Sequence, residues 1–158
     1  MTLKIRQMNR SDKPAVMRLL AAIPEFTPSE VTVAEEVIDS YLGEPSEYDI
    51  QVAELNSNIV GYICYGRTPL TEFTWDIYWM AVCPEKQNQG VGRSLLTFAE
   101  AKIREAKGRL IIIETSSKSE YEKTRRFHLR QGYHMICQIT DFYALGDDKL
   151  ILIKRLDK

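Results

Sequence analysis

The first half of the chain alternates between two hydrophobic periods, one of two residues and one of about 3.6 residues. Runs with the two-residue period, rich in β-branched and aromatic residues, predict strands. These strands cover 3–8, 48–55, 59–66 and 73–82, and the second and third flank a hairpin turn at 56–58. Ser11 to Pro14 form the cap and first turn of a predicted helix that ends before Pro24. Pro28 begins a second helix that runs to about Leu42.

The second half of the chain predicts a β-α-β unit followed by a helix and two strands. Apolar residues recur at helical spacing over 90–106, and Gly108 ends that helix before a strand over 110–113. Because a crossover helix joins this strand to 73–82, the two strands should be parallel with a right-handed connection. A helix over 119–131 and strands over 133–143 and 149–156 complete the chain.

This order of elements predicts an α/β fold, with helices on both faces of a mixed sheet. In the strand 73–82 both sets of alternating side chains are largely apolar, as in a central strand covered on both sides. One predicted face carries Trp75, Ile77, Trp79 and Ala81, and the other carries Asp76, Tyr78, Met80 and Val82. The two tryptophans are therefore expected to be core residues rather than a stacking platform.

Length and charge narrow the class of protein. At 158 residues the chain has the size of one domain, with no linker or repeat, so we expect a single domain over 1–158. Its 21 basic and 22 acidic residues give a net charge of −1, and no run of five like charges occurs. Nucleic acid or a membrane surface would need a charged patch that the sequence lacks, so the expected partner is a small molecule or a peptide.

The N-terminal residues and the cysteines bear on location and cofactors. The start of the chain lacks the apolar stretch of a signal peptide, and no apolar run reaches transmembrane length, so a cytoplasmic location is expected. Cys64, Cys83 and Cys137 are scattered, odd in number and without histidines at metal-ligand spacing. With His128 and His134 as the only histidines, no metal site is predicted.

The segment 83–94 has the composition of a phosphate-binding helix start. The first amides of a helix have no internal partner and lie at the positive end of its dipole, so a helix opened by glycine can bind phosphate with its backbone. Gly90 and Gly92 would allow a pyrophosphate to approach closely. A P-loop is excluded because Arg93 follows Gly92 where lysine is needed. A dinucleotide fingerprint is excluded because Leu95 stands where a third glycine is needed.

Two signatures resemble those of the GCN5-related N-acetyltransferase (GNAT) superfamily. The first is Q-x-x-G-x-G, written here as Gln87 to Gly92 after the strand end 79–82, and it resembles the acetyl-CoA signature of that superfamily. The second is the frame of Phe127 followed by Gly132-Tyr133 on the next helix. The order of elements is also similar, so the resemblance covers essentially the whole chain. It implies a central mixed, mostly antiparallel sheet whose parallel strand pair splays apart, and acetyl-CoA as co-substrate.

The resemblance also implies which residues contact acetyl-CoA. Strand amides at the splayed ends 80–82 and 114–116 would hold the pantetheine arm, and the glycine loop would hold the pyrophosphate. The implied contact set is Met80, Ala81, Val82, Gln87, Asn88, Gln89, Gly90, Val91, Gly92, Arg93, Ser94, Tyr121, Thr124 and Phe127. Three positions depart from the superfamily pattern: Tyr121 replaces an asparagine, Thr124 an alanine, and His128 the tyrosine that protonates the CoA thiolate.

The activity that the resemblance implies is acetyl transfer to a primary amine of a small molecule or peptide. Attack needs a neutral amine, whereas a lysine-like ammonium has a pKa of about 10.4, so a base is required. Glu114 is the candidate base because it follows the apolar run 110–113 at the carboxyl end of its strand, where ligands of α/β sheets gather. Asp76 and Tyr78 on the neighbouring strand are alternatives, acting through a water or by orienting the amine.

His128 is the candidate acid for the departing thiolate. An imidazolium with a pKa of about 6.5 can protonate a thiolate with a pKa of about 8.5. Tyr121, Tyr133 and Tyr143 are alternative proton donors. Direct attack in a ternary complex needs no acyl-enzyme, so Cys83 is not expected to act as a nucleophile.

The acceptor side of the site is defined by fewer residues. Asp76, Tyr78 and Tyr143 are the candidate substrate-binding residues, and carboxylates in the neighbouring loops would favour a cationic amine. Asp147 and Asp148 are two of these loop carboxylates, and a polar turn explains this pair at least as well as a role in binding the amine.

Two further hypotheses concern the molecule as a whole. Because residues 121 and 128 depart from the superfamily pattern, the domain could instead be a non-catalytic or weakly active acyl-CoA-binding sensor. A homodimer could form through the edge strand 149–156 together with Tyr62, Tyr65 and Trp79.

Overall fold

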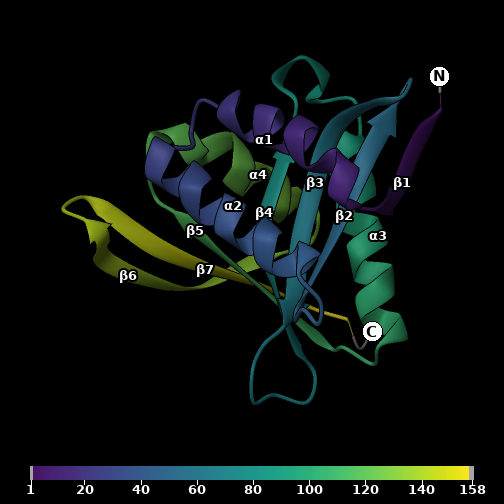
Figure 1. Ribbon diagram of the computed structural model, residues 1–158. Coiled ribbons are helices and arrows are strands. Elements are labelled where there is room, and N and C mark those ends of the chain that lie inside the picture. Colours follow the sequence, from purple (N-terminus) through teal and green to yellow (C-terminus); the bar gives the residue numbers. More distant parts are fainter. Residues whose placement is uncertain (1, 157–158) are drawn as a thin grey trace.

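A seven-stranded sheet with helices on both faces forms the centre of the molecule (Figure 1). The structure is a computed structural model, and it describes residues 2–156. Its strands are β1 (Leu3–Gln7), β2 (Tyr48–Leu55), β3 (Asn58–Arg67), β4 (Thr74–Val82), β5 (Leu110–Ser116), β6 (His134–Ala144) and β7 (Asp147–Arg155). Its helices are α1 (Lys13–Ala21), α2 (Pro28–Leu42), α3 (Val91–Glu105) and α4 (Glu122–Arg130), with short 3-10 turns at η1 (Arg10–Asp12), η2 (Pro84–Lys86) and η3 (Ser119–Tyr121). The predicted α/β class and order of elements are confirmed.

The strands lie in the order β1-β2-β3-β4-β5-β7-β6. The β4–β5 pair is parallel and every other neighbouring pair is antiparallel. The parallel pairing runs from Thr74–Leu110 to Ile77–Ile113 and stops there, although both strands continue. The segments 78–82 and 114–116 therefore diverge, which confirms the splay that the superfamily resemblance implied.

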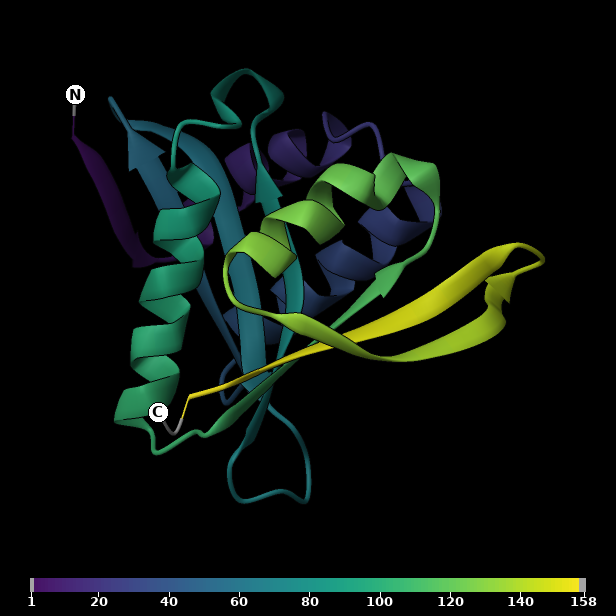
Figure 2. The same ribbon diagram turned by 180° about the vertical axis from the view of Figure 1, so that it is seen from behind.

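Two apolar clusters fix the helices to the two faces of the sheet. Helices α1 and α2 cover one face, where Leu20 and Ile38 pack with Ile50 of β2. Helices α3 and α4 cover the other face, as Figure 2 shows, and Leu95 and Ile111 lie in that second cluster. All five of these side chains are completely buried, so the amphipathic pattern of each helix determines its placement.

A β-bulge in β4 changes which residues share a face. Cys64 of β3 pairs with Trp79, but the next residue of β3 pairs with Ile77, so Tyr78 is an extra residue in β4. Beyond an inserted residue, side chains exchange faces. Met80 and Val82 accordingly pack with Trp75 and Ile77 on the α3 side, whereas Trp79 and Ala81 pack on the α1–α2 side. The predicted grouping of these residues by simple alternation was therefore wrong beyond Tyr78.

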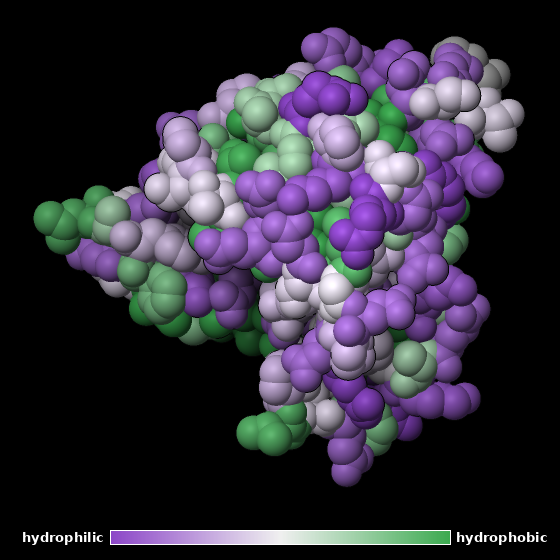
Figure 3. Space-filling model, viewed as in Figure 1, coloured by the Kyte–Doolittle hydropathy of each residue, from purple (hydrophilic) through white to green (hydrophobic). Residues whose placement is uncertain are grey.

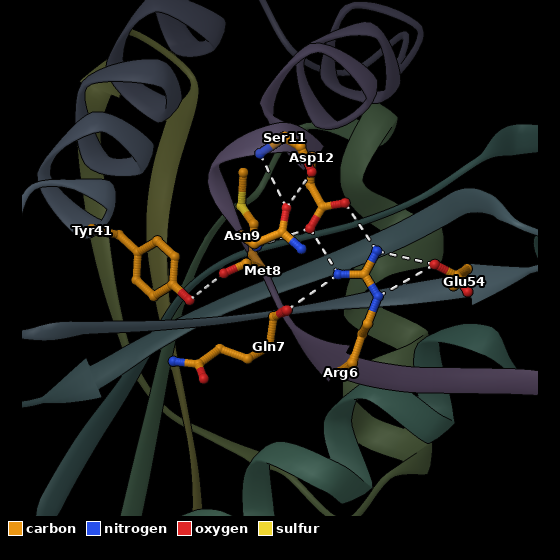
Figure 4. A network of polar contacts seen from close by, with 8 residues as sticks. All are labelled: Arg6, Gln7, Met8, Asn9, Ser11, Asp12, Tyr41 and Glu54. Atoms are coloured by element: carbon orange, nitrogen blue, oxygen red, sulfur yellow. Dashed lines mark hydrogen bonds and ion pairs between the residues drawn. The ribbon is translucent and has the colours of Figure 1, made fainter.

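An ion-pair network joins β1, η1 and β2 at one edge of the sheet (Figure 4). Arg6 donates to both oxygens of Asp12 at 2.8 and 2.9 Å and pairs with Glu54 at 3.0 Å. The guanidinium of Arg6 is the main cause of a lowered pKa at Asp12. The Asp12 carboxylate also accepts from the amide of Asn9, so the network closes the turn that leads into α1.

The β6–β7 hairpin projects from the body of the molecule (Figure 1), and β6 is the outer edge of the sheet. Large apolar side chains on the hairpin are exposed, including Ile136 at 57% and Leu145 at 92%. Figure 3 shows the apolar surface at the end of the hairpin. The edge strand of the sheet is therefore β6, and the predicted edge strand 149–156 lies inside the sheet as β7. Tyr62 and Tyr65 are 1% and 2% exposed, so their side chains cannot contact a second copy of the chain as predicted.

Candidate functional site

The start of α3 has the features of an anion-binding helix terminus. Gly90 precedes the helix with φ of 86°, a left-handed conformation that glycine adopts without strain. No side chain caps the amides that open α3, and no acidic residue lies in its first turn. The start of α2 differs, because Thr27 and Glu30 form a capping box there. The uncapped amides of α3, with the exposed Arg93 beside them, fit a phosphate group.

The two sequence signatures meet where α3 approaches α4. A Cβ added to Gly92 would lie 3.3 Å from the Phe127 ring and 3.6 Å from Val82, so a larger residue there would force the Phe127 ring to shift. Three of the predicted cofactor-binding positions are therefore in one place. The two signatures therefore contact one another directly through Gly92 and Phe127.

Other residues of the predicted loop stabilise its conformation. The Gln87 side-chain amide donates to the carbonyl of Val82 at 3.2 Å, and that of Gln89 donates to the carbonyl of Glu85 at 3.2 Å. Asn88 has a positive φ of 64° and is exposed. The loop glutamines thus shape the approach to α3 through the backbone.

The strand residues of the predicted cofactor set are placed differently by the bulge. Met80 and Val82 point toward α3, while the side chain of Ala81 is buried on the α1–α2 side, so only its backbone is available to a ligand. Ser94 and Thr124 are partly buried on α3 and α4. Val91 is 4% exposed and belongs to the core.

Tyr78 and Glu114 are the first residues beyond the paired part of β4 and β5, so they flank the apex of the splay. The Glu114 carboxylate is 2.8 Å from the ammonium of Lys149 on β7. The Tyr78 hydroxyl donates to Asp76 at 3.4 Å, and burial is the main cause that raises the pKa of Tyr78 to about 12. Asp76 also accepts from the Thr68 hydroxyl at 2.5 Å.

Two tyrosines lie beside carboxylates at the same end of the sheet. The Tyr121 hydroxyl donates to Glu30 at the start of α2 at 2.9 Å, which joins η3 to that helix. Burial raises the pKa of Tyr143, and the charges of Glu114 and Asp147 add to the effect. The site therefore combines groups from α2, β5, η3 and the β6–β7 hairpin.

His128 lies on the buried side of α4, apart from the residues at the splayed strand ends. Its side chain is 4% exposed, its ring packs against Phe127 and Tyr133, and its Nδ1 has no hydrogen-bond partner. Burial lowers the pKa of His128 to about 4, so the ring is neutral at neutral pH. At neutral pH His128 therefore lacks the imidazolium proton that donation to the CoA thiolate requires, which argues against His128 as the acid.

Tyr133, one of the alternative donors, is held in a buried polar network. Its hydroxyl donates to Glu100 of α3 at 2.9 Å, and Lys154 of β7 pairs with the same carboxylate at 3.1 Å. With its proton committed to Glu100 and only 2% exposure, Tyr133 is placed to stabilise the fold rather than to donate to a ligand.

Two residues of this region were not singled out from the sequence. Arg125 of α4 donates to the carbonyls of Ser116 and Lys118 at 2.8 and 2.7 Å, which fixes the end of β5. Lys149 pairs with Glu114 as described. Both contacts depend on how distant segments come together, and no local pattern indicates them. Within residues 2–156, no group of three or more His, Cys, Asp or Glu side chains could hold a metal ion.

Comparison with known proteins agrees with this geometry. A model of the acetyltransferase (GNAT) domain matches residues 46–135, which is more than half of the chain. The solved structure of a GNAT-family protein from Desulfovibrio desulfuricans is 37% identical, with a TM-score of 0.92 over 98% of this chain and 99% of that one. A search of curated proteins gives no match. No helix within the described residues has the length and apolar character to cross a membrane.

Two more distant structures share the fold. The ribosomal-protein-S18-alanine N-acetyltransferase of Escherichia coli is 16% identical, with a TM-score of 0.79 over 99% of this chain and 96% of that one. An aminoglycoside 6'-N-acetyltransferase solved with coenzyme A is also 16% identical, with a TM-score of 0.78 over 98% of each chain. The family model, the 37% identical relative and the splayed strand pair give one conclusion: the chain belongs to the GNAT family of acetyltransferases.

Proposed function

We propose that this protein transfers the acetyl group of acetyl-CoA to a primary amine of a small molecule or peptide, by direct attack in a ternary complex. One observation carries the proposal: β4–β5 pairing ends at Ile77–Ile113, and a carboxylate, Glu114, stands at the apex of the resulting gap. The uncapped start of α3 lies at the far end of the β4 side of the gap. Donor and acceptor could therefore meet at one carboxylate.

The residues at α3 fit the cofactor that the family uses. The open space beside Gly90 and the uncapped amides of 91–93 would hold the pyrophosphate, and the unpaired ends of β4 and β5 would hold the pantetheine arm. When bound, acetyl-CoA supplies a thioester whose carbonyl carbon is open to attack by an amine.

Glu114 would take the proton that the acceptor ammonium must lose. Its side chain is 46% exposed, so an acceptor can reach it from solvent. A carboxylate is a weak base for an ammonium with a pKa of about 10.4, so it deprotonates only a small fraction of the bound ammonium at a time. The neutral amine formed in this way then attacks the thioester carbonyl carbon. The Asp76 carboxylate accepts from the hydroxyls of Tyr78 and Thr68, which suits Asp76 and Tyr78 to orient the amine.

The thiolate that leaves CoA needs a proton, and two tyrosines are candidates for it. Tyr121 is half-buried and its hydroxyl donates to Glu30, and Tyr143 is 48% exposed, whereas His128 is neutral and buried. Tyr121→Phe and Tyr143→Phe variants separate the two candidates when transfer and acetyl-CoA binding are both measured, since Tyr121 also belongs to the implied acetyl-CoA contacts. Loss of the proton donor should slow transfer more than it weakens binding.

A second candidate function is an acyl-CoA sensor with little transferase activity. The observation in its favour is the ion pair between Lys149 and Glu114, which occupies the proposed base. Thiol release from acetyl-CoA over a panel of amines decides between the two functions. Amine-dependent release with formation of the N-acetyl product supports the transferase, while tight CoA binding without release for any amine supports the sensor.

The proposal includes pairing of two copies along β6. This strand carries one charged residue, Asp141, in eleven, and its outer edge has unpaired backbone groups. Natural edge strands of this length are usually protected by charge or by cover. An antiparallel β6–β6 contact about a two-fold axis would cover Met135 and Ile136 on both copies.

A further inference from the structure

Lys149 is held in an enclosure made of one carboxylate and two aromatic rings. Its ammonium nitrogen is 2.8 Å from Glu114 Oε1, 3.8 Å from the centre of the Phe142 ring and 5.9 Å from that of Tyr143. The Lys149 side chain is only 14% exposed. A carboxylate combined with aromatic faces is the chemistry by which proteins bind organic ammonium groups. We name Glu114, Phe142 and Tyr143 the ammonium cage.

All three members of the cage are partly exposed to solvent. Phe142 and Tyr143 are 49% and 48% exposed, and the Glu114 side chain is 46% exposed. Packing alone would bury aromatic rings more deeply, so these rings gain little from their present contacts. The cage thus has free aromatic and carboxylate surface within reach of a second ligand.

The ammonium cage lies at the splayed end of β5, where the surrounding charge favours a cation. Glu114 is the first residue of β5 beyond its pairing with β4, and the Lys149 ammonium that pairs with it also lies over the Phe142 and Tyr143 rings of the hairpin. The nearby charged groups are mainly acidic: Glu30 and Asp147 act on Tyr143, and Asp147 is paired with Lys118 at 3.6 Å. A cationic ligand is therefore favoured here over an anionic one.

We propose that the ammonium cage is the binding subsite for the acceptor's ammonium group, and that Lys149 is an internal occupant which the acceptor displaces. Only the identification of this ligand as the acceptor rests on the proposed function. The substrate class is an unbranched alkylammonium. An uncharged arylamine lacks the charge that the cage binds, and a carboxylate next to the amine would be repelled by Glu114.

The test compares binding of n-butylammonium to the wild type and to Lys149→Ala at pH 7, without acetyl-CoA, by chemical-shift titration. Vacating the cage should tighten binding about tenfold, the change expected when a competing charge is removed and a cation–π contact is gained. A further Phe142→Ala change in the Lys149→Ala protein should remove most of that gain. Lys149→Arg should bind like the wild type, because its side chain also fills the cage.

Lys102 provides the matched control. Its ammonium also lies over a ring, 5.6 Å from the centre of Phe98, and beside a carboxylate, 3.5 Å from Glu105, but on the outer surface of α3. Lys102→Ala should leave n-butylammonium binding unchanged. Equal or weaker binding by Lys149→Ala would overturn the proposal, as would a gain that survives loss of the Phe142 ring. Lys149→Val, whose β-branched side chain suits a strand and is too short to fill the cage, gives the same comparison if the alanine variant does not fold.

Failure of this inference can be distinguished from failure of the proposed function. If the wild type acetylates amines but Lys149→Ala shows no gain in binding, the cage assignment alone is wrong. If Lys149→Ala binds n-butylammonium as expected but no amine is ever acetylated, the subsite stands and the transferase activity is wrong.

Discussion

Glu114 is the residue on which the proposed chemistry depends. Glu114→Gln keeps the size of the side chain and removes its ability to accept a proton. We expect kcat/KM for amine acetylation to fall about 100-fold, within the usual range for loss of a general base, with little change in the KM for acetyl-CoA. Amine-dependent thiol release measures both.

A second carboxylate serves as the control for Glu114. Glu105 ends α3, is 70% exposed and also pairs with a lysine, so Glu105→Gln should leave the rate unchanged. Full activity in Glu114→Gln would transfer the base role to the Asp76–Tyr78 pair.

His128 is expected to affect stability rather than turnover. Its pKa of about 4 in the folded protein lies below the usual value of about 6.5 in an unfolded chain. The unfolded chain therefore binds the proton first as the pH falls. The contribution of His128 to the free energy of unfolding is fully present above about pH 6.5 and is lost as the pH falls toward 4, by about 3 kcal/mol at most.

Urea unfolding at pH 7 and pH 4.5 tests this prediction. His128→Phe should reduce the pH dependence in that range, because the group that the unfolded chain protonates is gone. His134→Gln should keep it, since His134 is exposed. If the free energy of unfolding of His128→Phe changes between pH 7 and pH 4.5 as much as that of the wild type, the buried ring does not titrate as described.

Among the elements, the end of β5 is held by a contact that the sequence does not indicate. Arg125 of α4 binds the carbonyls of Ser116 and Lys118, which keeps this strand end away from β4. Arg125→Met should raise the KM for acetyl-CoA several-fold with a smaller effect on kcat, because the cofactor gap loses its fixed edge.

The neighbouring residue on the same helix provides the comparison for Arg125. Arg126 forms an exposed i,i+4 pair with Glu122, so Arg126→Met should leave both constants unchanged. Equal effects of the two substitutions would mean that Arg125 acts only through helix stability.

Periodicity predicted the helices well because each one packs an apolar stripe against the sheet. The predicted second helix, 28–42, has the same bounds as α2, since Thr27, Glu30 and Pro28 specify its start locally. The bulge at Tyr78 was missed because it arises from pairing with β3 and has no local signature. The site divides in the same way: the two GNAT signatures located Gly92 and Phe127, whereas Lys149 and Phe142 meet Glu114 only through strand register.

For the whole molecule, the exposed β6 edge predicts a dimer. Light scattering after size exclusion should give a mass of about twice the 18.2 kDa of one chain. Ile136→Asp would place a charge in the β6–β6 contact and should give a monomer. Val33→Asp, on the exposed side of α2 at 48% exposure, should leave the dimer intact. A wild type that is monomeric at every concentration tested contradicts the β6 assignment.

Direct transfer between two bound substrates is the reaction that we propose for the molecule as a whole. It is tested by initial rates measured over a matrix of acetyl-CoA and n-butylamine concentrations, with the product identified by mass. We expect an intersecting pattern of initial rates, formation of N-acetylbutylamine and unchanged rates in Cys83→Ser. Parallel lines with loss of activity in Cys83→Ser would show an acyl-enzyme and contradict direct attack, and the absence of any acetylated amine would contradict the proposed function itself.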